Sequence, residues 1–137
     1  SVNIWLKEFI KNNSSSKTDN WSSEMLSISY HNLGLAQYRL KKYREANNTL
    51  YSSLKYTNKN TQSEKCYYIL ARSNFALRGY QESLYYIDKC KIDNDAYELK
   101  VRGQVYLANG MEDKAHKDFE RSCMLGNKWS CTKLSQL

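Results

Sequence analysis

An internal repeat of 37 residues is the feature that most restricts how this chain can fold. The sequence reads LKKYREA at 40–46 and LRGYQES at 77–83. With this shift the first copy aligns with the second at six pairs of similar positions: Leu33 with Leu70, Gly34 with Ala71, Leu40 with Leu77, Tyr43 with Tyr80, Glu45 with Glu82, and Ala46 with Ser83. A weaker third copy, VRGQVYLANGMEDKAHKDF, follows 32 residues later. Repeats of this length are typical of arrays in which each unit buries its apolar face by stacking on the next.

The apolar spacing within each copy predicts two helices. In the first copy, apolar and small residues recur in steps of three and four, at Tyr30, Leu33 and Gly34 and again at Ala46, Leu50 and Leu54. Short polar stretches at 41–42, 78–79 and 109–110 separate the two halves of each copy, as in antiparallel helical hairpins. The chain has no proline and only five glycines, so few positions oblige a helix to break. We therefore expect an all-α fold.

Composition indicates one globular domain. The 137 residues are 41% hydrophobic and 26% charged, which is within the range of packed proteins. No run of 18 apolar residues occurs, so we expect no membrane span. The first ten residues, SVNIWLKEFI, lack Met and the layout of a signal peptide. They begin a predicted leader helix, VNIWLKEFIKN, whose Trp5, together with Trp21, is expected to seat it on the first repeat.

The net charge of +7 comes entirely from the first part of the chain. Residues 1–80 carry 12 Lys or Arg and 5 acids, whereas residues 81–137 carry 9 of each. A basic surface favours an acidic partner, although a charge of this size affects association rates more than it identifies a ligand.

Three sets of residues resemble the tetratricopeptide repeat: Tyr30, Leu33, Gly34, Tyr43, Ala46, Leu50; Tyr67, Leu70, Ala71, Tyr80, Ser83, Ile87; and Leu99, Gly103, Tyr106, Ala115, Phe119. The last stretch, FERSCMLGNKWSCTKLSQL, is similar to the related Sel1-like repeat. The resemblance implies a right-handed superhelical solenoid of antiparallel helix pairs. Its expected parts are a leader helix and loop (1–26), three repeats (27–60, 64–95, 96–127) and a capping helix (128–137).

In that family the first helix of each pair lines a concave inner face. The resemblance therefore implies a partner-binding groove with an aromatic and basic wall, formed by His31, Leu35, Tyr38, Arg39, Lys65, Tyr68, Arg72, Phe75, Tyr97, Lys100, Gln104 and Leu107. Rings offer rigid contact area and cations offer charge-assisted hydrogen bonds. One subgroup of the family holds the acidic C-terminal tails of chaperones with a clamp of Lys, Asn and Arg side chains. This clamp is absent here, because the corresponding positions are occupied by His31, Leu35, Ile69, Tyr97 and Val101.

The four cysteines leave two possibilities open. There is no Cys-x-x-Cys pair, and both histidines lie far from any cysteine in sequence, so we expect no metal site. The Sel1-like resemblance implies a disulfide between Cys123 and Cys131. Cys66 and Cys90 would lie near the open end of one helical pair, where a second bridge is geometrically arguable. The alternative is that the cysteines are buried free thiols. If the thiols are free, we expect the protein in the cytoplasm. If Cys123 and Cys131 are bridged, we expect it in an extracytoplasmic compartment.

No catalytic constellation or phosphate-binding loop is present, so we expect neither enzyme activity nor a cofactor. The function that the sequence favours is protein interaction, in which the chain binds a peptide or helical segment of a partner as an adaptor, scaffold or secretion-type chaperone. An acidic segment would suit the positive net charge of the chain. The alternative is nucleic-acid binding, prompted by a pI of 9.2 and the cluster RLKKYR at 39–44. Self-association through the last helix is a third possibility.

Overall fold

The computed structural model describes residues 2–13, 20–57 and 60–137, and the described residues form helices and no strand. The all-α prediction is confirmed for this part of the chain. The helices are α1 (Val2–Asn13), α2 (Asn20–Arg39), α3 (Tyr43–Tyr56), α4 (Asn60–Ala76), α5 (Tyr80–Ile87), α6 (Ala96–Ala108), α7 (Glu112–Met124) and α8 (Lys128–Leu134). Within the described ranges, no helix has the length and apolar character needed to cross a membrane.

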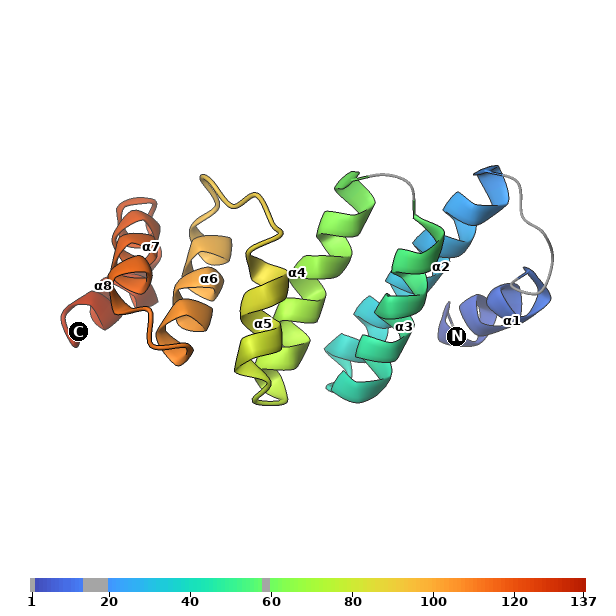
Figure 1. Cartoon of the computed structure of the whole chain (residues 1–137), viewed down its shortest axis with the longest axis horizontal. Helices are drawn as coiled ribbons and strands as arrows, with labels where there is room; N and C mark the ends of the chain where they lie inside the picture. Colours follow the sequence, from blue (N-terminus) through green and yellow to red (C-terminus); the bar gives the residue numbers. More distant parts are fainter. Residues whose placement is uncertain (1, 14–19, 58–59) are drawn as a thin grey trace.

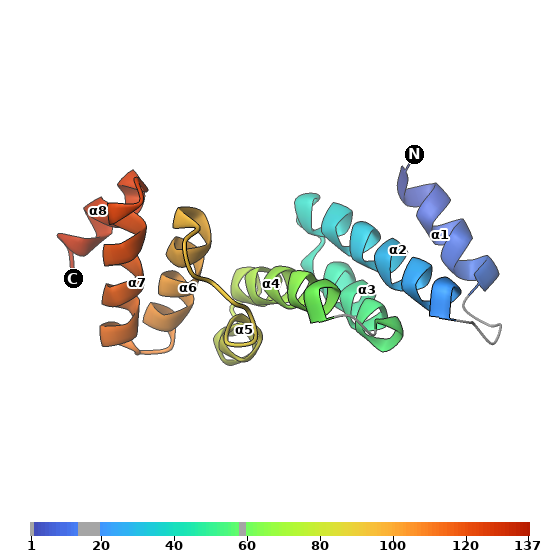
Figure 2. The same cartoon turned by 90° about the horizontal axis from the view of Figure 1, so that it is seen from above.

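The helices follow one another along the long axis of an elongated molecule (Figures 1 and 2). Helix α2 packs on α3, α4 on α5, and α6 on α7, so the described residues form three helical hairpins. Helix α1 packs on α2 at one end, and α8 packs on α7 at the other. Each hairpin thus has a neighbour on either side, as the internal repeat predicts.

The two similar heptads lie at the tight turns of the first two hairpins. Lys41 and Arg78 adopt left-handed backbone conformations with φ of 62° and 64°, and Gly110 has the same role in the third hairpin with φ of 74°. In the first turn, the N–H of Lys41 donates to the carbonyl of Tyr38 and the N–H of Lys42 donates to that of Gln37. These two bonds satisfy carbonyl groups that a helix end leaves free, as in the Schellman motif.

A second repeated contact closes the open end of each hairpin. Ser53 donates to the carbonyl of Ser27 at 2.7 Å, and Ser122 donates to that of Ala96 at 2.6 Å. In the second hairpin Cys90 donates to the carbonyl of Glu64 at 3.8 Å. All three pairs are 26 residues apart, and the pairs are shifted by the same 37 and 32 residues as the sequence repeat. The repeat is therefore present in the hydrogen bonds as well as in the amino-acid sequence.

Small residues let the paired helices approach closely. A Cβ atom on Gly34 would lie 2.7 Å from Leu50, and one on Gly103 would lie 2.6 Å from Phe119. Both large side chains are wholly buried. The middle hairpin has Ala71 and Ile87 at the equivalent positions, and both are also wholly buried.

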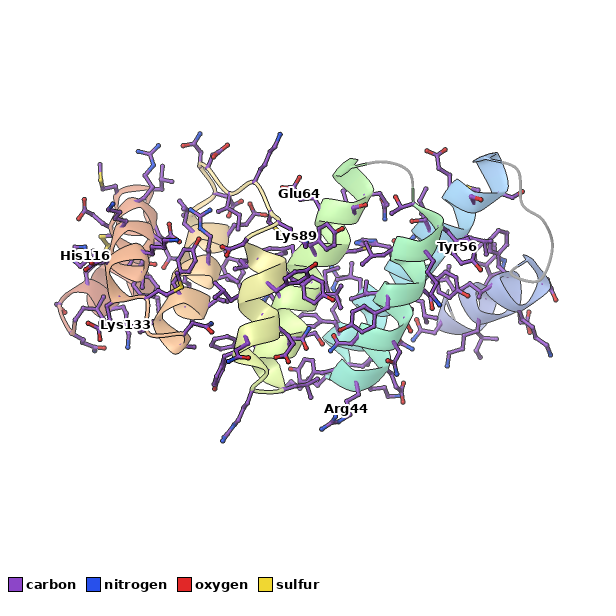
Figure 3. The ribbon with its side chains drawn as sticks, in the orientation of Figure 1. Arg44, Tyr56, Glu64, Lys89, His116 and Lys133 are labelled. Atoms are coloured by element: carbon purple, nitrogen blue, oxygen red, sulfur yellow. A yellow bond between two sulfur atoms is a disulfide. The ribbon has the colours of Figure 1, made fainter. Side chains whose placement is uncertain are left out.

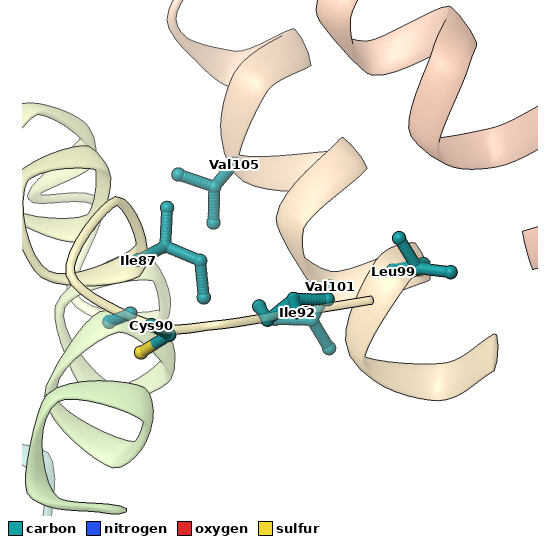
Figure 4. Packing of buried hydrophobic residues seen from close by; sticks show 7 residues of the cluster. Ile87, Cys90, Ile92, Leu99, Val101 and Val105 are labelled. Atoms are coloured by element: carbon teal, nitrogen blue, oxygen red, sulfur yellow. The ribbon is translucent and has the colours of Figure 1, made fainter. Parts of the chain in front are cut away.

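The second and third hairpins are joined by the chain segment after α5. Cys90 and Ile92 in this segment pack with Ile87 of α5 and with Leu99, Val101 and Val105 of α6 (Figure 4). Backbone carbonyls also link successive hairpins: Tyr43 accepts from Ser73 at 3.1 Å, and Tyr80 accepts from Asn109 at 2.9 Å. The rings of these two tyrosines lie against Tyr38 and Phe75 of their own hairpins.

The leader helix is present, but Trp5 does not seat it. The Trp5 side chain is 59% exposed and stacks on Phe9 of the same helix, whereas Leu6 and Ile10 are buried with Leu26 and Leu33. Helical periodicity explains this, because Leu6 and Ile10 are one turn apart on the face toward α2. The side chain of Trp21 and most of the predicted loop lie outside the described residues. Helix α2 begins at Asn20, before the expected start of the first repeat at residue 27.

Candidate functional site

A largely apolar cavity with a volume of about 470 Å³ lies between α2, α4, the segment after α5 and the start of α6. Ligand pockets in proteins commonly have volumes of roughly 300–1,000 Å³. Its lining includes six residues of the sequence-predicted groove: His31, Leu35, Tyr38, Lys65, Tyr68 and Arg72. It also includes six residues that the sequence did not indicate: Glu64, Ile69, Cys90, Lys91, Ile92 and Glu98.

A smaller cavity of about 170 Å³ adjoins the first, and both are lined by Tyr38 and Arg72. Phe75, Tyr97 and Gln104 of the predicted set line it, together with Ala76, Val101 and Val105. We call the two cavities together the main groove. Three predicted residues, Arg39, Lys100 and Leu107, line neither cavity: Arg39 is exposed, and Leu107 packs beside Tyr106, Ala115 and Phe119.

Arg72 lies at the junction of the two cavities and is surrounded by tyrosine rings. Its guanidinium carbon is 5.2 Å from the ring centroid of Tyr38, 5.7 Å from that of Tyr68 and 5.2 Å from that of Tyr97. It also donates to the Tyr97 hydroxyl at 2.8 Å. Cation–π contacts within about 6 Å are attractive, so the rings hold the guanidinium in place without neutralising its charge. Arg72 forms no ion pair with any carboxylate of the described residues.

The series of cations and rings continues towards the C-terminal end. Lys100 Nζ lies 5.2 Å from the Tyr97 ring centroid and 4.9 Å from that of Trp129, and Trp129 packs edge-on against Phe119. Lys100 is therefore next to the main groove although it does not line it. The contact series runs from α2 through α4 and α6 to α8.

Two buried polar atoms in the larger cavity lack hydrogen-bond partners among the described residues. They are the Nε2 atom of His31 and the hydroxyl of Tyr68. Burial lowers the pKa of His31, with Lys65 acting in the same direction and the Asn32 hydrogen bond opposing it, so the ring is neutral at pH 7. Burial also raises the pKa of Tyr68, which therefore keeps its proton. Unsatisfied buried polar groups are costly, and here both belong to residues that line the larger cavity.

The charge of the main groove is more mixed than that of the residues predicted from sequence. Glu64 and Glu98 contribute carboxyl groups beside Lys65, Arg72 and Lys91. Burial raises the pKa of Glu98, and the nearby carboxylates of Asp95 and Glu64 raise it further. The Glu64 carboxylate accepts a hydrogen bond from the backbone N–H of Lys91. This bond fixes the position of the segment that closes one side of the cavity.

The cysteines fall into two groups. Cys123 and Cys131 are bonded to each other, with their Cα atoms 4.7 Å apart, which is the pairing that the Sel1-like resemblance implies. Cys66 and Cys90 are buried free thiols and are not bridged. Burial raises the pKa of both thiols, that of Cys90 to about 12, so neither is a reactive thiolate near neutral pH.

Part of the groove could not be found by matching helical positions. Cys90, Lys91 and Ile92 follow the last residue of α5, where the helical spacing gives no information about the path of the chain. Ile69 and Val101 line the cavities with part of their surface although both are buried. A signal was present for Glu64, since it lies one helical turn before Tyr68, a predicted groove residue on the same helix.

We compared the chain with models of known protein families and with curated proteins, and it matches none of them.

Proposed function

We propose that this chain is a non-catalytic protein-interaction module that binds a peptide or helical segment of a partner in the main groove. We further propose that its three hairpins form a right-handed superhelical solenoid of the tetratricopeptide type, ending in a Sel1-like unit. The observation that carries the proposal is a largely apolar cavity of ligand size beside Arg72, whose guanidinium is held by three rings and pairs with no carboxylate of the described residues.

The side chains of the main groove are suited to binding at low entropic cost. Arg72 is already oriented by three rings, and tyrosines lose little conformational freedom when they bind. Leu35, Ile69 and Ile92 give the larger cavity apolar walls. An apolar side chain of the partner would fill this space, while its polar groups would meet His31 and Tyr68.

The net charge of +7 and the unpaired guanidinium of Arg72 favour a partner segment that carries acidic residues near its anchor. An adaptor, a scaffold and a secretion-type chaperone would each use such a groove. We propose the shared activity, capture of a protein segment, rather than one of these roles.

The experiment is selection of a displayed random-peptide library on the purified chain, followed by affinity measurement of the enriched peptides. Tyr68→Ala combined with Arg72→Ala should lower the affinity at least tenfold, measured at a temperature at which circular dichroism shows the same helical content for the variant and the unaltered chain. Tyr85→Ala with Lys89→Ala is the matched control, because Lys89 lies 4.6 Å from the Tyr85 ring centroid outside the main groove. Peptides that bind the first variant as well as the unaltered chain would refute the proposal.

Nucleic-acid binding is the second candidate, since alternating rings and cations also occur on surfaces that bind single strands. The rings of Tyr97 and Trp129 already have cations over them, which leaves less of each face for a base. A titration with single-stranded and duplex oligonucleotides distinguishes the two candidates. Affinity for nucleic acid would fall steeply with rising salt concentration, whereas capture through an apolar anchor would change little.

A further inference from the structure

The two cavities of the main groove follow one another along α4. This helix contributes Glu64, Lys65, Tyr68, Ile69 and Arg72 to the larger cavity, and Arg72, Phe75 and Ala76 to the smaller one. Glu64 lies near the upper end of α4 in Figure 3, whereas Ala76 is the last residue of the helix. Arg72 is thus the last α4 residue of one cavity and the first of the other. A segment that occupies both cavities must pass this side chain.

The guanidinium group itself, and not only the aliphatic part of Arg72, lies where the cavities meet. Its carbon is 5.2 Å from the ring centroid of Tyr38, which lines both cavities. It is 5.2 Å from the ring centroid of Tyr97 in the smaller cavity and 5.7 Å from that of Tyr68 in the larger one. Arg72 is partly exposed, and Tyr97, to which it donates a hydrogen bond, is 45% exposed. A ligand group in the groove can therefore reach the guanidinium from solvent.

The charges around the two cavities are different. Arg72 is the charged residue of the smaller cavity, and no acidic residue is among the described residues that line it. Lys100 adds positive charge nearby, because its Nζ lies 5.2 Å from the Tyr97 ring centroid. The larger cavity instead contains the carboxyl groups of Glu64 and Glu98. A carboxylate of the partner is therefore favoured at Arg72, where it can form charge-assisted hydrogen bonds, and disfavoured beside the two glutamates.

Apolar walls lie on both sides of Arg72. They are formed by Leu35, Ile69 and Ile92 in the larger cavity and by Phe75, Val101 and Val105 in the smaller one. The volumes are about 470 Å³ and about 170 Å³. Because apolar walls favour apolar ligand groups, the larger cavity suits a bulky apolar side chain and the smaller one a short apolar side chain.

We infer that the main groove recognises an internal segment of its partner in which one acidic residue lies between a bulky apolar residue and a small apolar one. The acidic side chain pairs with Arg72, the bulky residue enters the larger cavity, and the small residue enters the smaller one. The acidic residue is not the last of the partner chain, because a chain that ended there would leave one cavity without an anchor. This specificity rests on the function proposed above and adds to it the composition and order of the bound segment.

The first test is the consensus of the peptides that the displayed library yields. They should share one acidic residue with an apolar residue on each side, the bulkier one always on the same side. In the tightest-binding peptide, replacing the acidic residue by its amide should lower the affinity by about tenfold, since a charge-assisted pair is lost. Replacing the bulky residue by alanine should also weaken binding.

A double-mutant cycle connects the acidic residue of the peptide to Arg72. In Arg72→Gln, the acidic peptide and its amide counterpart should bind equally well. Lys89→Gln is the matched control, because Lys89 is exposed and lines neither cavity. That variant should keep the preference of about tenfold for the acidic peptide. A preference that persists in Arg72→Gln would overturn the inference.

Ala76→Leu tests the smaller cavity at an exposed position, where a larger side chain does not disturb the core. It should weaken binding of the full peptide and leave unchanged the binding of a peptide that lacks the small anchor. Equal effects on both peptides would contradict the assigned order.

Tyr68→Ala, which retains Arg72, separates the inference from the function on which it rests. Peptides that lose affinity in Tyr68→Ala but bind equally well with the acidic residue or its amide would overturn the inference and leave the proposed function standing. A consensus whose acidic residue is the C-terminal one, with apolar residues on one side only, would have the same meaning. Peptides that bind Tyr68→Ala with Arg72→Ala as well as the unaltered chain would refute both.

Discussion

Arg72 shows how a single residue can remain charged in a partly enclosed position. Three rings and one hydroxyl surround its guanidinium, and no carboxylate of the described residues pairs with it. Cation–π contacts favour the charged form without cancelling it, so the guanidinium can still bind an incoming carboxylate. The sequence placed Tyr38, Tyr68 and Arg72 on one wall, but it did not indicate that the rings would enclose the cation.

At the same scale, His31 should make stability depend on pH. The pKa of His31 is lowered in the folded chain, mainly by burial. Below the ordinary histidine pKa of about 6.5, the unfolded chain therefore binds a proton that the folded chain does not, and the free energy of unfolding should fall as pH falls through this value. Urea unfolding at a series of pH values measures this.

Two variants isolate the contribution of His31. His31→Gln should flatten the dependence between pH 7 and 5. His116→Gln, at the exposed histidine 3.6 Å from Glu120, should leave most of it in place. An unchanged slope in His31→Gln would show that the buried ring is not responsible.

Gly103 should not tolerate even one added carbon. A Cβ atom would lie 2.6 Å from the wholly buried ring of Phe119, which has no room to withdraw. We expect Gly103→Ala to lower the free energy of unfolding by about 1–3 kcal/mol despite the better helix propensity of alanine. Gly79→Ala is the control, because the nearest atom there is the movable Glu82 carboxylate at 3.0 Å. Equal stability of the two variants in urea would contradict the close approach of α6 and α7.

At the scale of elements, the hairpin turns carry a removable strain. Lys41 and Arg78 have φ values of 62° and 64°, which cost a residue with a side chain about 1–2 kcal/mol relative to glycine. Glycine loses part of this advantage, about 0.5–1 kcal/mol, through its greater freedom in the unfolded chain. Lys41→Gly and Arg78→Gly should therefore each raise the free energy of unfolding by up to about 1 kcal/mol. The comparison is Lys42→Gly, at φ of −89°, which should not be stabilising in thermal melts.

The elements were more predictable than the paths between them. The helical spacing and the paired heptads predicted helical hairpins with turns at 41–42, 78–79 and 109–110, because apolar periodicity and turn residues are local signals. The start of α2 at Asn20 and the inward course of Cys90 and Ile92 were not predictable, since both depend on contacts between hairpins. Three lining residues of the larger cavity, Cys90, Lys91 and Ile92, were missed for that reason. The two unpartnered groove atoms could be recognised only from the arrangement of their neighbours.

At the scale of the whole molecule, the chain should respond locally to reduction of its disulfide. The Cys123–Cys131 bond closes a short loop at one end of the row, between α7 and α8. The chain-entropy relation gives about 2–3 kcal/mol for a loop of this length. Because the hairpins of the described residues make most of their contacts with their neighbours in the row, this loss should be confined largely to the last helices.

Hydrogen exchange with and without a thiol-free reductant measures the effect. Amides of α7 and α8 should exchange faster after reduction, while those of α2 and α3 should keep their protection. Cys123→Ser with Cys131→Ser should reproduce the reduced chain. Equal acceleration along the whole chain would show that the molecule unfolds as one unit.

The bond that closes the open end of each hairpin has a consequence for how such a scaffold can change over time. The donor is a serine in the first and third hairpins and a cysteine in the second, and its acceptor is a main-chain oxygen of Ser27, Glu64 or Ala96. Since a main-chain oxygen is present in every residue, the residue that carries the acceptor can be substituted without loss of this hydrogen bond. Two descendants of one ancestral array could thus keep the same architecture while their sequences drift far apart.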